Sequence, residues 1–456
     1  MAGTAGEYRR GSDELARRVI DIRRIRNEPD VVRSALARRG IDMQDLGRVI
    51  ELDRAHRELS GRRDELRARI KELSRQVATA RRQGDEAGAE EAAATSRTMG
   101  EEESGLGAQL DGIGAELRET LLGIPNLPDA GAPDGASADD NPVLRWWAPQ
   151  GVRMGEDGVP VHDAHQSVPH WDVGTELGIL DLERGAKLSG SMFPLYRGDG
   201  ATLVRALTAF ALDHHHPDFE EIRPPTMVRT DTMVSTGHLP KFADDAYHIE
   251  RDDLWAIPTA EVPLTSLRRD EILAESELPI RLTAATPCYR REAGSAGRDT
   301  RGVLRVHEFD KVEILAYTTP EQAADMHAEL LERAEALLRA LELTYRVVDL
   351  CSGDLGQSAA RTFDLEAYAP GCGMWLEVSS VSWFTDYQAR RANLRYRQAA
   401  GGIAFVHTLN GSALAWPRIW AALVETHRRP DGNVAIPAAL RPYMRGQETI
   451  TRRTSG

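Results

Sequence analysis

The sequence predicts an α+β protein, in which an antiparallel sheet flanked by helices follows a pair of antiparallel helices that form a coiled coil. Two observations carry this prediction. Apolar residues recur at heptad-like spacing between residues 66 and 121. Beyond residue 150, helical segments and β-branched runs alternate irregularly and not as repeated βαβ units, which favours an antiparallel sheet.

Composition excludes several classes of protein. The chain has 456 residues, 41% apolar and 28% charged, which is typical of globular proteins and not of disordered or low-complexity chains. It has no apolar run of about 18 residues and no apolar segment of a secretory signal, so we expect a cytoplasmic protein without a membrane span. Fifty-seven basic and 71 acidic residues give a net charge of −14, which argues against a chain that coats nucleic acid but leaves a local basic face open.

The three cysteines predict no disulfide framework. Cys288, Cys351 and Cys372 are an odd number, lie far apart and form no C-x-x-C pair. We therefore expect buried thiols and no structural zinc. His214, His215 and His216 are adjacent, so their side chains diverge, and we expect no metal there either.

The coiled coil follows a short helical head at residues 21–40. Its first seam ends at Gln83-Gly84-Asp85, and its second ends at Gly123-Ile124-Pro125. Two helices of some 30 residues each predict a hairpin roughly 45 Å long. The seam residues are Leu66, Ile70, Leu73 and Val77, and then Met99, Leu106, Leu110, Ile113, Leu117 and Leu121.

The two predicted helices carry opposite charge. Residues 60–83 hold eight basic and three acidic residues, net +5, and residues 85–120 hold two basic and ten acidic residues, net −8. Either the opposite charges of the two helices pair with each other, or the first helix binds the phosphates of a nucleic acid. The pattern leaves both open.

A stretch rich in proline, glycine and aspartate then indicates a linker. The predicted organisation is an N-terminal extension (1–20), the helical arm (21–124), the linker (125–150), a catalytic domain (151–446) and a polar tail (447–456). Within the catalytic domain we expect helices at residues 200–214, 320–341 and 417–428. Neither a P-loop nor a Rossmann glycine pattern occurs.

The densest group of chemically useful residues lies at 286–315, in two strand-like runs joined by a Gly/Arg loop. In a strand, Arg290 and Glu292 would share one face, and Glu313 lies on the returning run. An arginine beside carboxylates can clamp phosphate while the acids bind an amino group or a metal. Surface ion pairing across the strands is the alternative for any single pair.

These residues resemble a known family. Cys288–Glu292 and Arg305–Glu313, with the loop between them, resemble motif 2 of class II aminoacyl-tRNA synthetases in its seryl-tRNA synthetase form. The resemblance covers nearly the whole chain. The segments 21–26, 377–380 and 388–391 are also similar to the family, as are the serine-binding loop at 257–264 and the entry to motif 3 at 408–415 with Arg418. The resemblance of residues 219–225 to motif 1 is weaker.

The resemblance implies a class II fold and a ligase that activates L-serine with ATP and Mg²⁺ and transfers it to tRNA(Ser), with tRNA(Sec) as a second candidate substrate, through the basic helix of the arm. It also implies a homodimer, with Pro225 near the neighbouring site. Arg290 and Arg418 would be catalytic, holding the α-phosphate and the far end of the triphosphate, while Phe309 stacks on adenine. Implied ATP-binding residues are Arg290, Arg291, Glu292, Val306, Phe309, Glu377, Val378, Ser379, Ser380 and Arg418, of which Glu377 and Ser380 would bind the metal; implied serine-binding residues are Thr259, Ala260, Glu261, Arg290, Glu313, Asn410 and Ser412.

The implied roles suit the chemistry. Attack of a carboxylate on the α-phosphorus needs no protein nucleophile, only positioning and charge stabilisation. A polar pocket that pairs the serine hydroxyl rejects alanine by roughly 10⁴–10⁵. Glu313, Asn410 and Ser412 meet that need better than apolar residues would.

Four residues depart from the family pattern. Val381 and Trp383 stand where Cys and Asn are usual, and Trp416-Pro417 replaces Val-Gly before Arg418. We expect the motif 3 helix to begin there, with Trp416 beside the nucleotide or serine pocket. These departures motivate one alternative, a secondary synthetase for a specialised pathway or inhibitor resistance. The others are a ligase that charges a carrier protein and a non-catalytic RNA-binding protein.

Overall fold

The computed structural model describes residues 20–41, 43–294 and 299–452, so the N-terminal extension predicted at 1–20 lies almost wholly outside the described residues. The chain folds as two units, one of which holds the described residues up to Ala37 together with Ile41–Pro125. The other holds Arg38–Gly40 and the residues from Asn126 onward.

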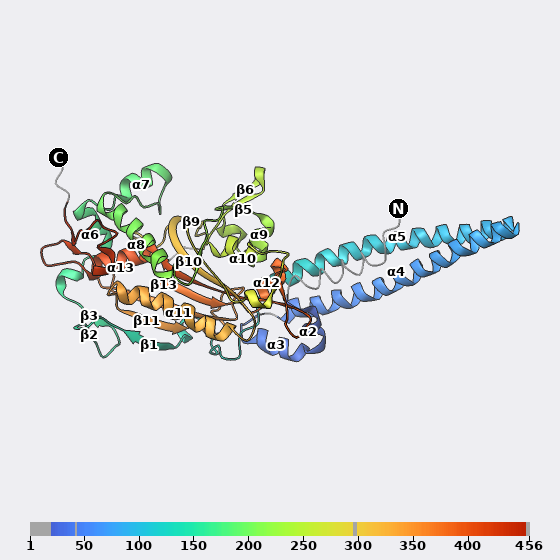
Figure 1. The fold of residues 1–456 in the computed structure, drawn as a ribbon, viewed down its shortest axis with the longest axis horizontal. Helices are drawn as coiled ribbons and strands as arrows, with labels where there is room; N and C mark the ends of the chain where they lie inside the picture. The colour runs from blue at the N-terminus through green and yellow to red at the C-terminus, as the bar shows by residue number, and fades with distance from the viewer. Residues whose placement is uncertain (1–19, 42, 295–298, 453–456) are drawn as a thin grey trace. The chain divides into compact units, whose positions relative to one another are not determined.

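The first unit is helical. The predicted head forms α2 (Ile22–Asn27) and α3 (Pro29–Ala37), and the hairpin consists of α4 (Met43–Gln83) and α5 (Glu86–Gly123). Figure 1 shows α4 and α5 side by side along their length. The predicted turn is confirmed, because Gly84 has a φ of +75° and the Asp85 side chain caps α5 by accepting from the Gly88 N–H at 2.9 Å.

The hairpin is longer than the sequence suggested. With 41 and 38 residues, its helices reach about 60 Å at 1.5 Å per residue. The prediction missed residues 43–59, where Val49 and Leu52 are buried among many charged positions. The seam itself is partly as predicted, with Leu73, Leu106, Leu110, Leu117 and Leu121 buried.

The second unit is built on an eight-stranded sheet in the order β1-β11-β12-β13-β16-β10-β9-β4. The prediction of an antiparallel sheet holds for every neighbouring pair except β4–β9, which is parallel. The strands are β1 (Val143–Trp147), β4 (Glu220–Glu221), β9 (Ile280–Tyr289), β10 (Glu308–Thr318), β11 (Tyr345–Asp349), β12 (Arg361–Ala369), β13 (Met374–Trp383) and β16 (His407–Ala415).

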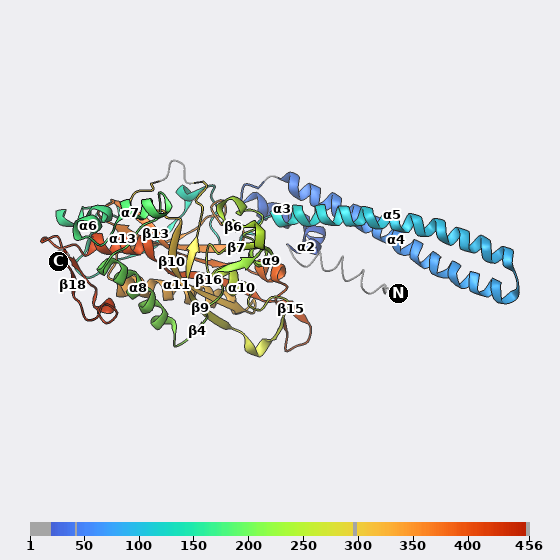
Figure 2. The same cartoon turned by 90° about the horizontal axis from the view of Figure 1, so that it is seen from above.

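Three helices cover one face of this sheet (Figure 2): α8 (Asp199–His215), α11 (Ala323–Ala340) and α13 (Trp416–Thr426). They match the three predicted helices within a few residues. The opposite face, at the β9–β10 end, is partly covered by α10 (Glu261–Ser266) and α12 (Tyr387–Ala392).

Smaller elements complete this unit. The remaining helices are α6 (His170–Leu177), α7 (Leu182–Ser189) and α9 (Thr230–Ser235). The remaining strands are β2 (Arg153–Met154), β3 (Pro160–Val161), β5 (Met227–Arg229), β6 (His248–Ile249), β7 (Leu254–Ala256), β8 (Ile272–Ala274), β14 (Arg395–Arg397), β15 (Ile403–Phe405), β17 (Val434–Ala435) and β18 (Thr449–Ile450).

Two predicted boundaries differ from the structure. Strand β1 lies inside the stretch 125–150 expected as linker, where it pairs with β11 at the edge of the sheet. Strand β18 lies inside the tail expected from residue 447 and pairs with β17. Proline and glycine masked β1 in the first stretch, and β18 is too short, at two residues, to give a strand pattern in the second.

The cysteines are free thiols. Cys288 and Cys351 are buried as predicted, but Cys372 is half-buried in the turn between β12 and β13. Among the three adjacent histidines, His215 is buried while His216 is exposed. Within the described residues, no helix combines the length and apolar character that crossing a membrane requires.

Candidate active site

A cavity of about 510 Å³ opens on the large sheet, within the range usual for small-molecule sites. Strands β10, β13 and β16, the start of α13 and the β9–β10 loop form most of its wall, with a segment after α9 on one side. Its lining residues include Met233, His238, Phe242, Asp245, Pro258, Arg290, Glu292, Leu304, Arg305, Val306, Phe309, Lys311, Glu377, Val378, Ser379, Ser412, Pro417 and Arg418.

Arg290 lies just beyond the end of β9. Its backbone N–H donates to the His307 oxygen at 2.9 Å, and its Nε donates to the Pro258 oxygen at 3.4 Å. The guanidinium carbon lies 5.3 Å from the ring centroid of Phe309. The predicted shared strand face of Arg290 and Glu292 is wrong, because β9 ends at Tyr289 and Glu292 has a φ of +50°. Both residues nevertheless line the cavity.

Arg418 lies in the first turn of α13. Its Nη1 donates to the Glu377 oxygen at 2.7 Å and lies 3.7 Å from the Glu377 carboxylate. Its Nε donates to the Leu304 oxygen at 3.2 Å. One arginine therefore ties β13 and the end of the β9–β10 loop to α13 at the cavity wall.

A buried ion pair forms the floor beside the cavity. Lys311 and Glu313 alternate with apolar residues along β10, so both point to the same face, and Nζ lies 2.5 Å from Oε2 of Glu313. Thr259 donates its hydroxyl to the same oxygen at 2.7 Å. Burial raises the pKa of Glu313, and Lys311 opposes that shift. The other oxygen, Oε1, is buried and has no hydrogen-bond partner among the described residues.

A second buried carboxylate lies close to the first. Glu261 accepts a hydrogen bond from Gln388 Nε2 at 2.6 Å, and the Gln388 oxygen accepts one from Thr408 at 2.7 Å. Burial raises the pKa of Glu261, which Gln388, Lys311 and the Asn410 amide oppose. Two buried carboxylates beside one lysine give this corner the means to hold a cationic group.

A third group of acids lies where β12 pairs with β13. Asp364 lies opposite Ser380 in the strand pair. Burial, and then the charge of Glu377, raise the pKa of Asp364, and its Oδ1 is buried without a hydrogen-bond partner among the described residues. The oxygen atoms of Asp364, Ser380 and Glu377 are ligands of the kind that hard cations prefer.

The structure brings most of the predicted site residues together. Those that line the cavity are Arg290, Glu292, Val306, Phe309, Glu377, Val378, Ser379, Ser412 and Arg418. Thr259, Ala260, Glu261, Glu313 and Asn410 are buried in the corner beside it. Arg291 differs, because its side chain is exposed and its backbone N–H donates to the Asp245 oxygen at 2.8 Å. The roles given to all these residues remain predictions.

Sequence reasoning missed several residues of the wall. Lys311 and Arg305 stood inside the motif but received no role; Arg305 donates to Glu292 at 2.5 Å. His238 and Phe242 lie in an irregular segment without a sequence signal. Burial lowers the pKa of His238 to about 3, aided by Arg290 and Lys311, so its imidazole is neutral.

The departures from the family pattern have structural explanations. The helix α13 begins at Trp416, as predicted, with Pro417 in its first turn. The expected position of Trp416 beside the pocket is wrong, because its side chain is 2% exposed in the core and only Pro417 lines the cavity. Val381 is in the same core, and Trp383 donates its ring N–H to His407 Nδ1 at 3.2 Å.

The opposite charges of the two hairpin helices are partly paired with each other. Ion pairs join Arg63 and Arg67 of α4 to Glu103 of α5, at 2.6 and 2.8 Å, and another joins Arg62 to Glu102. A Cβ at Gly107 would lie 2.8 Å from the Arg63 guanidinium, so this glycine makes room for the pair. Other basic residues of α4 are exposed and have no inter-helix ion pair among the described residues of the hairpin: Arg69, Lys71, Arg81 and Arg82.

Comparison with protein families gives two matches. The model of the seryl-tRNA synthetase N-terminal domain matches residues 19–128. The model of the tRNA synthetase class II core domain (G, H, P, S and T) matches residues 246–427.

Individual proteins match over nearly the whole chain. A serine–tRNA ligase of Thermomicrobium roseum is 46% identical over 439 residues, covering 95% of each chain. That of Gemmatimonas aurantiaca is 48% identical over 430 residues, covering 93% of this chain and 98% of the relative. The crystal structure of seryl-tRNA synthetase from Pyrococcus horikoshii complexed with ATP has 33% identity and a TM-score of 0.87, covering 95% of this chain and 100% of that one.

Proposed function

Because the chain belongs to the seryl-tRNA synthetase family and is a serine–tRNA ligase, we propose that the cavity on its large sheet is where serine reacts with ATP. The observation that carries this assignment is the unpartnered Glu313 Oε1, buried beside the cavity. A buried acceptor without a partner is costly, so a ligand that donates to it gains affinity and selectivity.

Serine fits the corner around that oxygen. Its ammonium group can pair with the buried carboxylates Glu261 and Glu313, and its hydroxyl can pair with the polar groups of Asn410 and Ser412. An amino acid without the hydroxyl would leave those groups unpaired. The corner therefore favours serine over alanine.

ATP fits the wider part of the cavity. Phe309 offers a ring for adenine to stack on, with Glu292 and Val306 at its edge. Arg290 would hold the α-phosphate and Arg418 the far end of the triphosphate. A serine carboxylate oxygen then attacks the α-phosphorus, the bond to the bridging oxygen breaks, and pyrophosphate leaves. The arginines stabilise the negative charge that develops.

Mg²⁺ fits the acids of β12 and β13. Glu377 and Ser380 would hold the ion, and the unpartnered Asp364 Oδ1 beside them supports a cation at this place. Bound there, Mg²⁺ would offset the charge of the triphosphate. The protein itself would supply further positive charge, because Arg418 lies next to Glu377 and can turn toward the same phosphates.

The tRNA partner fits the exposed basic residues of α4. Within the basic stretch 60–83, the inter-helix ion pairs use Arg62, Arg63 and Arg67, so charge complementarity explains part of the basic pattern. Arg69, Lys71, Arg81 and Arg82 remain exposed, and we assign them to tRNA phosphates. The substrate would be tRNA(Ser), with tRNA(Sec) as a second one to test, and the reaction would take place in the cytoplasm, where tRNA is charged.

We also propose that the protein works as a homodimer. The edge strand β4 has only two residues, and the exposed Leu267 and Ile272 lie on segments near that end of the sheet. Light scattering at micromolar protein gives the mass directly. A monomer would contradict this assignment without affecting the reaction.

The deciding experiment is ATP–pyrophosphate exchange with each amino acid, followed by transfer of the activated one to purified tRNA. Serine alone should support both steps. Exchange without transfer to tRNA would favour a carrier-protein ligase, and no exchange would favour a non-catalytic RNA-binding protein. Normal activity at altered inhibitor sensitivity would favour a secondary synthetase.

A further inference from the structure

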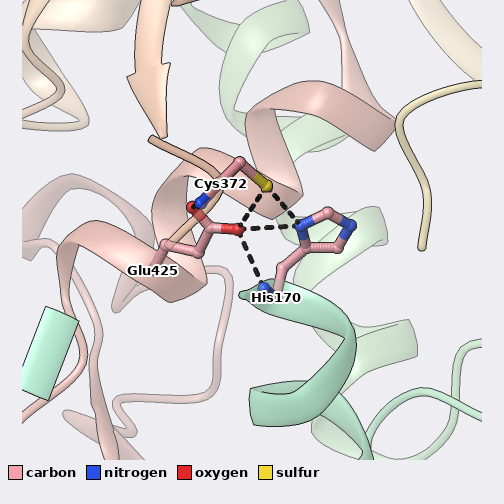
Figure 3. Close-up of side chains that lie close together, drawn as sticks. All are labelled: His170, Cys372 and Glu425. Carbon is pink, nitrogen blue, oxygen red and sulfur yellow. Dashed lines mark hydrogen bonds and ion pairs between the residues drawn. The ribbon is translucent and has the colours of Figure 1, made fainter. Parts of the chain in front are cut away.

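Three polar side chains that do not line the cavity lie close together in the interior (Figure 3). This cluster consists of His170, the first residue of α6, Glu425 near the end of α13, and Cys372 in the β12–β13 turn. The side chains of His170 and Glu425 are fully buried. One nitrogen, one sulfur and one carboxylate oxygen lie within 4.8 Å of one another.

Hydrogen bonds around Glu425 fix the protonation of His170. Oε1 accepts from the His170 backbone N–H at 2.8 Å and from the Cys372 thiol at 3.1 Å, and Oε2 accepts from the Gly371 and Cys372 backbone N–H groups at 2.8 and 3.2 Å. His170 Nδ1 lies 2.8 Å from Oε1. Because both oxygens of Glu425 already accept hydrogen bonds from N–H and thiol donors, Glu425 is also the acceptor of the ring contact, and Nδ1 carries the proton.

The opposite nitrogen of the ring must then be an acceptor. Nε2 receives a hydrogen bond from the Val303 backbone N–H at 3.0 Å, and a backbone N–H can only donate. Both sides of the ring therefore require the same neutral tautomer. The chain passes directly over the ring, because a Cβ at Gly302 would lie 2.2 Å from Nε2.

This hydrogen-bond pattern separates the cluster from a metal site or a nucleophile. A metal ion would have to displace the proton on Nδ1 and the thiol proton, and burial followed by Glu425 raises the pKa of that thiol. The thiol lies near Nδ1, whose proton goes to Glu425, so the ring offers it no free base. The cluster is suited to holding backbone in place.

What it holds is the returning end of the β9–β10 loop. Val303 is fully buried, and the next three residues, Leu304–Val306, line the cavity. The same segment is held a second time, by Arg418 Nε on the Leu304 oxygen. Arg418 and Glu425 lie two turns apart on α13, so one helix holds the segment both directly and through His170.

We propose that His170 is a positioning residue for ATP: its Nε2 fixes Val303 and so keeps Leu304–Val306 shaped for the nucleotide. This inference rests on the function proposed above for the cavity. It gives His170 no contact with substrate and no part in proton transfer.

Two conservative variants of His170 test the hydrogen bonds of its two ring nitrogens separately. In His170→Asn the side-chain amide can still donate to Glu425 but has no atom at the position of Nε2. In His170→Gln the longer amide can place its oxygen there and accept from Val303. In ATP–pyrophosphate exchange we expect His170→Asn to raise KM for ATP about tenfold with KM for serine unchanged, and His170→Gln to stay within about threefold of wild type.

Further variants keep the test independent of folding. Gly302→Ala crowds Nε2 and strains the backbone at a φ of +60°, so it displaces the segment and should raise KM for ATP as His170→Asn does. Cys372→Ala removes only the thiol from Glu425 and should leave both KM values unchanged. Melting temperatures measured alongside report the general cost of disturbing the cluster.

Several results would overturn the inference. One is that His170→Asn and His170→Gln lower the melting temperature alike while KM for ATP stays at the wild-type value. Another is that both substrates' KM values rise together. Stoichiometric zinc that is lost in Cys372→Ala would identify a metal site instead. Absence of exchange by the wild-type protein would instead refute the proposed function itself, and the inference with it.

Discussion

The guanidinium of Arg290 lies over the ring of Phe309, with 5.3 Å between its central carbon and the ring centroid. The two residues assigned to the α-phosphate and to adenine therefore touch each other. Adenine and the guanidinium compete for that face of the ring, so we expect nucleotide binding to draw Arg290 from the ring toward phosphate.

Replacing Arg290 by alanine should reduce pyrophosphate exchange by about 10²–10³ in kcat, because a cation aimed at developing charge is lost. Stability should change little, since among the described residues the side chain donates a single long hydrogen bond, to the Pro258 oxygen. Exchange kinetics and thermal melting measure the two effects. Arg397→Ala, an exposed arginine on β14, serves as the control, and normal exchange by Arg290→Ala would remove its assigned role.

The exposed basic residues of α4 should matter for tRNA and not for serine activation. Replacing Arg69, Lys71, Arg81 and Arg82 together by alanine should raise KM for tRNA at least tenfold and flatten its dependence on salt. Pyrophosphate exchange should be unchanged. Arg54→Ala, also on α4 but on its earlier part, is the matched control; equal tRNA charging by the fourfold variant would contradict the assignment.

Removing the distal hairpin tests the same idea more severely. Joining residue 59 to residue 106 deletes the far parts of α4 and α5 that the Arg62–Glu102 and Arg63–Glu103 ion pairs hold together. It keeps the near part, in which Arg48 of α4 pairs with Glu116 of α5, so the remaining helix faces stay paired. We expect serine activation to survive and tRNA charging to be lost. A deletion variant that charges tRNA normally would show that the hairpin is not needed for binding.

Substitutions of Trp416 and Pro417 should have different effects, the first on stability and the second on KM for ATP. Trp416→Val should cost about 2–4 kcal/mol of stability, because a core side chain is shortened, and should leave KM for ATP unchanged. Pro417→Gly lies at the cavity wall and should alter KM for ATP at similar stability. Denaturant unfolding measures the stability of each single variant, and exchange kinetics measure its KM for ATP. A changed KM for ATP in Trp416→Val would show that Trp416 does influence the pocket.

His215 should weaken the protein in acid. Burial lowers its pKa to about 3, and neither ring nitrogen has a partner among the described residues. The unfolded chain takes up a proton near pH 6.5 and the folded chain only near pH 3, so stability falls as pH drops between these values. At pH 4.5 the loss is roughly 3 kcal/mol.

His215→Phe should remove that loss and the cost of the unpaired nitrogens. Denaturant unfolding at pH 7.5 and pH 4.5 gives the difference for each variant. The exposed His216→Gln is the control and should behave like wild type. Equal losses of stability in His215→Phe and wild type would mean that another group accounts for the acid dependence.

The sequence predicted features that repeat locally and missed features that depend on distant contacts. The hairpin turn at Gly84 follows from the end of a heptad seam, and the start of α13 follows from Pro417. Arg290 and Glu292 look like strand residues, but the strand ends at Tyr289, where the backbone turns to bond Ile257 and His307. No local pattern encodes those partners.

The site shows the same limit. Residues of the recognised motifs reached the cavity, whereas His238 and Phe242 come from an irregular segment whose position depends on the whole fold. Trp416 was misplaced because an indole can fill a core or line a pocket, and the side of the helix decides which. His170 gave no signal at all, since its partners Val303 and Glu425 are more than a hundred residues away.

The order of strands in the large sheet bears on how the chain reaches this state during synthesis. Strand β16 lies between β13 and β10, yet it is made after every other strand of that sheet. Until it emerges, the nascent chain holds two half-sheets with open edges, and Ser412 and Arg418 have not yet joined the site. β1 waits longest for its partner, because about 200 residues separate it from β11, or roughly 10–40 s of elongation at about 5–20 residues per second. The binding site is therefore complete only after β16 and α13 have been made, and a chain terminated before β16 leaves the facing edges of the two half-sheets unpaired.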